Sequence, residues 1–350
     1  MVAHNESVAS PNSDSDSNPN PNLKSFSGGQ RVRSAVKIVL VVYTLLAVML
    51  GFFQRKLLYH PSTAKKLPIA SDRELMKLFP ASKDLRIKCS DGTEIGAWWL
   101  NHQETAPTKP NETTDDVAAA TATDHREASE AAQNGSRRPL ILYFHGNANH
   151  RGSRGPWYQL FAAVGADVLA IDYHGYGDSG GSMSEGGMYQ DCDAAWAYAT
   201  QELNYAPSEI IIAGTSLGGA AAVYTAFKQK DETQQPAALV VTATFSSMLD
   251  VARSLYPWLP VTAILVDRYP SAERIPEIKC PIVIMHGDQD RLVYTKHGQK
   301  LFDLAPARSQ SGHPKRWVTL DGIGHNGLVR LAGKQIQKEF QTVVNQLNQR

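Results

Sequence analysis

A serine lies between glycines at a point where the chain is expected to leave a strand. Ser216 is the centre of the sequence Gly-Thr-Ser-Leu-Gly at 214–218, which follows the apolar run 210–213 and precedes a stretch of small residues. The spacing matches the G-x-S-x-G nucleophile elbow. Here the chain reverses so sharply that a Cβ two residues before or after the serine would crowd the neighbouring strand and helix. Ser216 is therefore the candidate nucleophile.

The candidate acid follows the apolar strand pattern of 281–286. This run ends in a polar turn that contains Asp288 and Asp290. We choose Asp290, because two residues further along the loop its side chain can turn back toward the active edge of the sheet. Asp288 is interpreted as a residue that caps the turn through its own backbone.

The candidate base is His325. Of the 11 histidines, it alone lies beyond the acid on a loop that follows the last expected strand, 316–320. Three rivals are near it in sequence: His286 ends a strand, His297 begins a helix and His313 falls in a polar loop. None of the three occupies the position that follows serine and acid in the required order.

These three residue types together could carry out acyl transfer. A serine hydroxyl is a weak nucleophile at neutral pH, so His325 must take its proton during attack and later give it to the leaving group. Asp290 would hold the imidazole in the right tautomer and stabilise the imidazolium. The chemistry also needs donors for the developing oxyanion, each typically worth about 3 kcal/mol.

The oxyanion donors are expected after the strand 140–144. That strand runs into His145, Gly146 and Asn147, and the backbone N–H groups of Asn147 and of Leu217, the residue after the nucleophile, would face the developing charge. The imidazole of His145 is interpreted as a group that orders the loop, since backbone donors would meet the oxyanion.

Taken together, the motifs resemble the α/β-hydrolase superfamily. More narrowly, they resemble its single-pass, membrane-anchored α/β-hydrolase-domain serine hydrolases, a group similar to serine aminopeptidases and lysophospholipases. The matching segments are 144–148, 172–179, 214–218, 286–290 and 324–326, within 84–348. The resemblance implies an α/β-hydrolase fold: a mostly parallel central sheet, helices on both faces and a small cap.

The chain departs from the family pattern at two places. His174 stands where relatives often carry arginine, and the loop after Asn147 reads Ala-Asn-His-Arg-Gly in place of the commoner Ala-Gly. Neither change removes a catalytic group, although both can alter the support of the loops. The resemblance transfers the type of reaction and leaves the substrate open.

Strands that alternate with helices must position these residues. A hairpin with an Asp-Gly turn joins 85–89 to the strand that begins at residue 94, and a final helix carries an apolar stripe over 336–347. Between them, parallel βαβ units are expected. Their strands lie near 140–144, 167–172, 209–213, 238–244, 281–286 and 316–320.

Residues 246–279 are expected to form a small cap, because this fold inserts its cap after the strand near 238–244. The segment is strongly apolar and about thirty residues long. It could line an acyl-chain pocket or touch a bilayer, or it could simply cover the edge of the sheet.

The front of the chain differs in composition from the rest. Residues 1–34 form an expected disordered tail, 35–53 an expected transmembrane anchor, and 54–350 the hydrolase domain, with an expected disordered insertion at 103–138. The segment 35–53 is long enough for a hydrocarbon core of about 30 Å. A cleaved signal peptide and a buried core helix are the alternatives to the anchor.

A single-pass membrane protein with an N-terminal anchor is the expected localisation. Basic residues flank the apolar segment in nearly equal number on both sides, so the positive-inside rule gives almost no preference for either orientation. The short polar tail favours an inside N-terminus, which would place the catalytic domain on the non-cytoplasmic side. Possible glycosylation sites at Asn111 and Asn134 add little, because such tripeptides are common.

Composition limits the function classes. The 350 residues are 42% hydrophobic with a net charge of +1, which gives no reason to expect a nucleic-acid partner. The three cysteines, Cys89, Cys192 and Cys280, form no C-x-x-C pair and are expected to be buried without a disulfide. No metal site or nucleotide fingerprint is indicated, so no cofactor is expected. The oligomeric state is undetermined.

Three functions from different classes remain. The first is a membrane-anchored serine hydrolase that cleaves an ester or thioester of a lipid or acylated substrate through an acyl-enzyme. The second is a serine aminopeptidase, which would need an acidic pocket for the substrate amine; the cap region offers only Asp250, Asp267, Glu273 and Glu277. The third is a non-catalytic hydrolase-like scaffold, which a complete set of Ser216, Asp290 and His325 disfavours.

Overall fold

The computed structural model describes residues 28–102 and 137–349. The chain divides into two units, Met1–Met49 and Leu50–Arg350. Residues 1–27 of the tail expected at 1–34, and 103–136 of the insertion expected at 103–138, lie outside the described residues.

The larger unit is built on one central sheet. Among the described residues, eight strands pair in the order β2-β3-β6-β4-β7-β8-β9-β10. Strand β3 is antiparallel to both of its neighbours, and the remaining pairs from β6 to β10 are parallel. The strands are β2 (Lys83–Lys88), β3 (Glu94–Leu100), β4 (Leu140–Phe144), β6 (Asp167–Ile171), β7 (Ile210–Thr215), β8 (Ala238–Thr242), β9 (Ile282–Gly287) and β10 (Arg316–Leu320).

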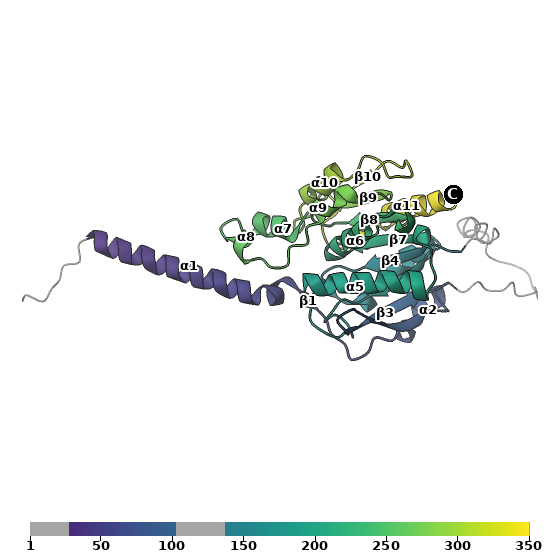
Figure 1. Ribbon diagram of the computed structural model, residues 1–350, viewed down its shortest axis with the longest axis horizontal. Helices are drawn as coiled ribbons and strands as arrows, with labels where there is room; N and C mark the ends of the chain where they lie inside the picture. Colours follow the sequence, from purple (N-terminus) through teal and green to yellow (C-terminus); the bar gives the residue numbers. More distant parts are fainter. Residues whose placement is uncertain (1–27, 103–136, 350) are drawn as a thin grey trace, which may run out of the picture. The chain divides into compact units, whose positions relative to one another are not determined.

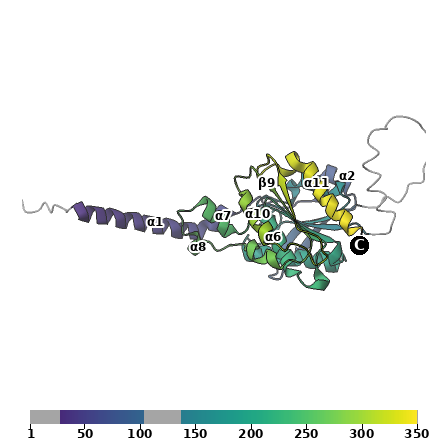
Figure 2. The same ribbon diagram turned by 90° about the horizontal axis from the view of Figure 1, so that it is seen from above.

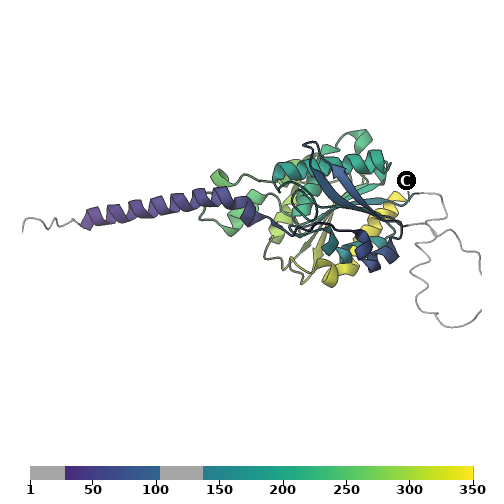
Figure 3. The same ribbon diagram turned by 90° about the horizontal axis from the view of Figure 1, so that it is seen from below.

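Helices cover both faces of this sheet. Helices α5 and α6 pack together on one face, whereas α4 packs against α2 and α11 on the other. Figure 1 shows the two layers, and Figure 2 and Figure 3 show them from above and from below. The helices are α1 (Gly28–Leu58), α2 (Arg73–Leu78), α4 (Gly155–Ala163), α5 (Glu185–Ala197), α6 (Leu217–Lys228), α7 (Met248–Leu255), α8 (Val261–Ile264), α9 (Ser271–Arg274), α10 (Thr295–Leu304) and α11 (Leu328–Leu347).

The central strands form because they are apolar on both faces. All five residues of β4, β6 and β8 are buried, as are the first five of β7. Parallel strands covered by helices on both sides read as continuous apolar runs, which is why the sequence predicts them well. The fold class expected from the sequence is confirmed, and each expected strand is present within two residues of its predicted bounds.

Helix α1 is longer than the expected anchor. It begins at Gly28 and ends at Leu58, so residues 28–34 are helical and the prediction of a disordered tail over 1–34 is wrong for them. A helix that has nucleated adds residues at little cost in free energy. It can therefore extend back to the two glycines at its start, although glycine is a poor helix former. The 27 residues Val32–Leu58 are long and apolar enough to cross a membrane, by length and composition alone, and a signal sequence meets the same test.

The insertion also ends earlier than expected. Arg137, placed in the insertion 103–138 by its sequence, donates hydrogen bonds to the carbonyls of Leu203 (2.8 Å) and Asn204 (2.7 Å). Its guanidinium lies 3.5 Å from the ring centroid of Tyr205. The polar composition of the segment concealed this contact, because an arginine that stacks on a distant tyrosine has no local sequence signal.

A buried arginine joins the loops at the carboxyl end of the sheet. The Nη1 atom of Arg151 lies 2.5 Å from Asp172 Oδ2 and 2.7 Å from Asp178 Oδ1. Arg151 and Asp172 are almost fully buried, and exposed Arg86 also pairs with Asp178 at 2.7 Å. One guanidinium therefore compensates two carboxylates that follow β6.

Replacing this arginine tests the buried pair. Arg151→Met should lower the free energy of unfolding by about 3–5 kcal/mol, because it leaves Asp172 without its buried partner. Urea unfolding measures the loss. The control is Arg253→Ala, whose side chain is 53% exposed and 4.0 Å from Asp250, and which should cost less than about 1 kcal/mol. Equal, small losses in both variants would contradict the assignment.

Candidate active site

Ser216 occupies a sharp turn between β7 and α6. Its backbone has φ 55° and ψ −118°, a conformation that costs energy for a residue with a side chain. Two hydrogen bonds, one to the last residue of β8 and one to the loop after it, hold it there. The Ser216 N–H donates to the Thr242 carbonyl (2.9 Å), and the Thr244 hydroxyl donates to the Ser216 carbonyl (2.8 Å). The side chain thus lies at the carboxyl edge of the sheet, as the motif predicts.

The flanking glycines are required by close backbone approach. A Cβ on Gly214 would lie 2.1 Å from the Gly218 carbonyl oxygen, and a Cβ on Gly218 would lie 2.0 Å from the carbonyl oxygen of Phe144. No side chain rotation relieves a clash with backbone. The turn can therefore form only with glycine at both positions.

The structure brings the three residues chosen from the sequence into one hydrogen-bonded row. His325 Nε2 lies 3.0 Å from Ser216 Oγ, and His325 Nδ1 lies 2.7 Å from Asp290 Oδ2. Ser216 follows β7, Asp290 follows β9 and His325 follows β10. Because these strands are parallel, their carboxyl ends share one edge, and residues far apart in sequence meet there.

Asp290 is held as a carboxylate. Burial by itself raises its pKa, but hydrogen bonding to His286 and His325 outweighs burial and holds the pKa of Asp290 well below its usual range. The other oxygen, Oδ1, accepts from the backbone N–H groups of Leu292 (2.9 Å) and Val293 (2.8 Å). The carboxylate is therefore fixed in orientation as well as in charge.

The alternative acid lies elsewhere. Asp288 is exposed, and its Oδ1 accepts from the N–H of Gly322 at 2.7 Å. This corrects the expectation that it caps its own turn: it braces the turn after β10. The reason is tertiary, because β9 and β10 are adjacent and their terminal loops touch.

The rival histidines have other contacts. His286 Nε2 lies 2.8 Å from the carbonyl oxygen of Val293 and 3.4 Å from Asp290 Oδ2, so this residue helps to hold the carboxylate of Asp290. His297 Nδ1 bonds Ser246 at 3.1 Å. His313 lies in the loop before β10, where its backbone N–H donates to Ser309. Nothing in the spacing of His286 announced its contact with Asp290.

The loop expected to supply an oxyanion donor lies beside the nucleophile. Strands β4 and β7 are neighbours, with Phe144 paired to Gly214. A Cβ on Gly146 would lie 3.6 Å from the Cβ of Ser216. The backbone of Asn147 thus follows a residue that contacts the serine, and the N–H of Leu217 begins helix α6, whose N-terminus favours negative charge.

His145 orders this loop and is buried. Its Nδ1 lies 2.7 Å from the Gly146 carbonyl and its Nε2 lies 3.1 Å from Asp172 Oδ1. Burial lowers the pKa of His145 despite the nearby carboxylate. The Tyr173 hydroxyl donates to the His145 carbonyl at 2.7 Å. These contacts fit the loop-ordering interpretation.

Arg151, which belongs to the unusual loop after Asn147, is part of the same support. Its backbone N–H donates to Asp172 Oδ1 at 2.6 Å, in addition to the ion pairs described above. The unusual loop therefore connects the oxyanion segment to the turn after β6.

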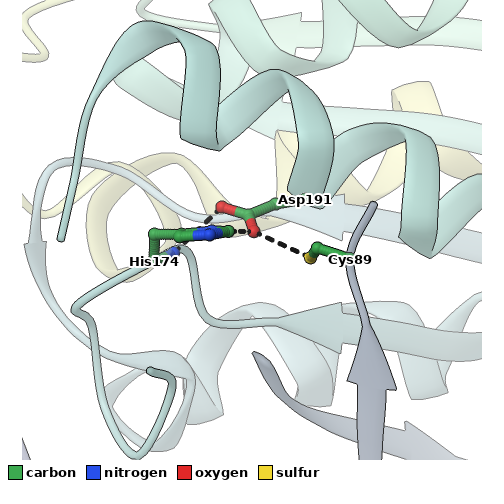
Figure 4. A group of neighbouring side chains, drawn as sticks. All are labelled: Cys89, His174 and Asp191. Carbon is green, nitrogen blue, oxygen red and sulfur yellow. Dashed lines mark hydrogen bonds and ion pairs between the residues drawn. The ribbon is translucent and has the colours of Figure 1, made fainter. Parts of the chain in front are cut away.

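One cluster offers three potential metal ligands. Cys89, His174 and Asp191 are buried, with their ligand atoms within 4.8 Å of one another (Figure 4). Hydrogen bonds already join these side chains. Cys89 Sγ donates to Asp191 Oδ1 at 3.4 Å, and His174 Nδ1 lies 2.5 Å from the same oxygen. A metal would have to displace both protons, and burial raises the pKa of the Cys89 thiol.

His174 lies between two carboxylates in this cluster. Its Nε2 lies 3.1 Å from Asp91 Oδ2 on the β2–β3 turn, and hydrogen bonding to Asp191 raises the pKa of His174. The raised pKa favours the protonated imidazole, which can compensate these carboxylates as the arginine of the family resemblance would. The departure at His174 is therefore compatible with charge compensation.

The cap segment is small and partly exposed. It comprises α7, α8 and α9 with their connections. Three apolar side chains of this segment are exposed to solvent: Tyr256 is 48%, Trp258 57% and Val266 62% exposed. Val251 and Val261 are buried, so the segment both packs on the domain and presents an apolar surface.

Comparison with known proteins agrees with the fold. The family model described as serine aminopeptidase, S33, matches residues 135–271. Uncharacterized protein Rv2307c of Mycobacterium tuberculosis is 31% identical over 304 residues, 87% of this chain and 92% of that protein. Lysophosphatidylserine lipase ABHD12 of Danio rerio is 34% identical over 199 residues, 52% of each chain.

A further relative and a solved structure extend the likeness. Alpha/beta hydrolase domain-containing protein 17B of Xenopus laevis is 31% identical over 213 residues, 61% of this chain and 68% of that protein. The Pyrococcus furiosus esterase Pf2001 superposes with a TM-score of 0.56 at 17% identity, covering 83% of this chain and 97% of that one. At that identity the superposition speaks for the fold alone. With the strand order and the matched relatives, it follows that this chain belongs to the α/β-hydrolase superfamily.

Proposed function

We propose that this hydrolase uses Ser216 as nucleophile, His325 as general base and Asp290 as the orienting acid. The observation that carries the proposal is the position of the imidazole, with Nε2 3.0 Å from Ser216 Oγ and Nδ1 2.7 Å from Asp290 Oδ2. An ionised Asp290 accepts a hydrogen bond from Nδ1–H, which leaves Nε2 unprotonated and able to accept the proton of the serine.

The reaction then proceeds through an acyl-enzyme. Ser216 Oγ attacks the carbonyl carbon while His325 takes its proton, and the resulting oxyanion accepts from the N–H groups of Asn147 and Leu217. The intermediate collapses, and His325 gives its proton to the departing alcohol or thiol. Water, deprotonated by His325, attacks the acyl-Ser216 ester, and as this second intermediate collapses His325 returns the proton to Ser216 Oγ, which releases the acid product and regenerates the serine.

The proposed substrate class is an ester or thioester of a lipid or acylated molecule. Exposed Tyr256, Trp258 and Val266 on the cap segment provide an apolar approach, and the matched zebrafish relative is named a lysophosphatidylserine lipase. The apolar helix Val32–Leu58 supports a membrane anchor, which would place the site beside lipid substrates. We further propose a non-cytoplasmic catalytic domain, which is the side expected from the sequence.

The aminopeptidase alternative finds less support in the charges of the cap region. A peptidase of this type needs a carboxylate to bind the substrate amine. Asp250 pairs with Lys300 at 2.8 Å, Asp267 with Arg55 at 2.9 Å, and Glu277 with Lys230 at 2.5 Å. Three of the four carboxylates in this region are thus occupied by this protein's own cations.

The nucleophile can be tested with an activity-based probe. A fluorophosphonate should label the full-length protein in detergent, whereas Ser216→Ala should show no label and no turnover. His325→Ala should lose turnover by at least about 10³-fold, since removing the base leaves only binding and oxyanion stabilisation. The control for intact folding is the thermal unfolding midpoint. Equal labelling of wild type and Ser216→Ala would refute a serine hydrolase.

The choice of acid has a matched pair of variants. Asp290→Asn should reduce kcat by about 10⁴-fold, because the amide favours the wrong imidazole tautomer. Asp288→Asn keeps an acceptor for Gly322 N–H and should retain turnover within about threefold. Hydrolysis of p-nitrophenyl butyrate by folded protein provides the rates. The reverse ranking would identify Asp288 as the acid.

The substrate class can be separated by a panel of model substrates. We expect hydrolysis of acyl esters and thioesters, with kcat/KM rising about tenfold or more as the acyl chain lengthens and buries more CH₂ groups. Aminoacyl p-nitroanilides with a free amine should be poor substrates. Preference for the p-nitroanilides, lost when the amine is acetylated, would instead favour the aminopeptidase.

A further inference from the structure

The last turns of α1 are attached to the cap segment by side chains. Within the larger unit, Gln54 Nε2 donates to the Ile264 carbonyl at 2.9 Å, and Gln54 Oε1 accepts from the N–H of Val266 at 2.8 Å. Arg55 binds the carboxylate of Asp267 with Nε at 2.9 Å and Nη2 at 3.1 Å. The helix end thus holds residues 264–267 by both backbone and charge.

Tyr59 continues this attachment in the interior. It is 4% exposed, its hydroxyl lies 2.9 Å from Asp267 Oδ2, and the same hydroxyl lies 2.6 Å from that of Tyr269. Tyr59 has one hydroxyl proton, so it donates to the carboxylate and accepts from Tyr269. Tyr269 is fully buried with a positive φ of 47°, a backbone conformation that such contacts help to hold.

The backbone on either side of Tyr59 is bound by Asn147. The Asn147 Nδ2 donates to the Leu58 carbonyl at 2.7 Å, and the N–H of His60 lies 3.4 Å from Asn147 Oδ1. The Tyr176 hydroxyl donates to Asn147 from the other side, at 2.7 Å to its carbonyl and 2.8 Å to Oδ1. The side chain of the residue proposed as an oxyanion donor is therefore held by the chain that follows α1.

A short parallel pairing strengthens the same junction. Strand β1 (His60–Pro61) pairs with β5 (Ala148–Asn149), and the Ser62 hydroxyl donates to Asn149 Oδ1 at 3.3 Å. Asn149 has a positive φ of 63°. The oxyanion loop thus has a neighbour of its own outside the main sheet, and that neighbour is the segment that leaves the helix.

We propose that Tyr59 is a positioning residue that couples the helix end and the cap segment to the oxyanion loop. Its side chain is fixed at Asp267 and Tyr269, and its flanking backbone fixes Asn147. Displacement of Tyr59 moves the loop that donates to the oxyanion, so catalysis depends on how the chain leaves α1. This inference rests on the proposed serine-hydrolase function.

The first experiment compares two conservative variants of the full-length protein. Tyr59→Phe removes one hydroxyl and keeps the ring. Tyr205→Phe is the matched control, since the buried hydroxyl of Tyr205 donates to buried Asp167 at 2.7 Å. Asp167 is the first residue of β6, so it lies at the amino end of the parallel strands, away from the site at their carboxyl ends. With p-nitrophenyl butyrate, Tyr59→Phe should lower kcat by about tenfold with KM nearly unchanged, whereas Tyr205→Phe should stay within about twofold.

The second readout is specific to the oxyanion. A trifluoromethyl ketone adds to Ser216 and forms the same oxyanion, so its inhibition constant should rise in Tyr59→Phe by the factor by which kcat/KM falls. Asn147→Ala breaks the chain of contacts from the other end, and its effect should be less than additive with that of Tyr59→Phe. It also serves if Tyr59→Phe does not fold.

Three outcomes decide the matter. Normal kcat in Tyr59→Phe, equal losses in Tyr59→Phe and Tyr205→Phe, or full additivity with Asn147→Ala would each overturn the coupling. In all three cases wild type would still be active and Ser216→Ala inactive. Turnover that survives in Ser216→Ala would instead overturn the proposed function, so the two failures are distinguishable.

Discussion

The strained backbone of Ser216 is the constraint on which the site depends. A positive φ at a serine costs about 1–3 kcal/mol, and the turn persists because the ends of β4, β7 and β8 surround it. The Thr242 carbonyl and the Thr244 hydroxyl bind the serine backbone, and Gly218 lies against the end of β4. This close packing places the hydroxyl beside His325 and brings the loop after β4, the proposed oxyanion loop, alongside it. The fold and the reactive geometry are consequences of the same contacts.

Buried charges around the site are compensated by the chain itself. Arg151 pairs with Asp172 and Asp178, and His174 pairs with Asp191 and Asp91. Asp290 pairs with His286 and His325. Such pairs add little net stability over apolar packing, but losing one partner is costly. They therefore fix the loops after β4, β6 and β9 in single arrangements. A reaction that needs atoms placed to within about half an ångström requires such fixed loops.

The end of helix α1 binds the cap segment through polar side chains, which the hydropathy of the helix does not predict. Residues 50–58 belong to the compact unit that contains the sheet, and their polar side chains Gln54 and Arg55 bind the cap segment. The apolarity of the helix by itself predicts no such contacts. The segment that follows α1 pairs with the loop after β4, so the position of the loop and the end of the helix are physically linked.

The central strands and the order of serine, acid and histidine could be predicted from the sequence alone, because both depend on local patterns. Apolar runs bounded by turns mark β4, β7 and β9, and the glycines around Ser216 report a turn that only glycine permits. By contrast, Arg151 meets Asp172 and His174 meets Asp91 across separate loops of the fold. His286 lies only four residues before Asp290, and the local fold of that loop brings the two side chains together. The loops that carry Arg151 and Asp172 meet because the parallel strands β4 and β6 bring their carboxyl ends to one edge. The tertiary structure alone decided which side chains compensate the buried charges and which segment pairs with the loop after β4, since these contacts have no periodicity or spacing that a sequence can display.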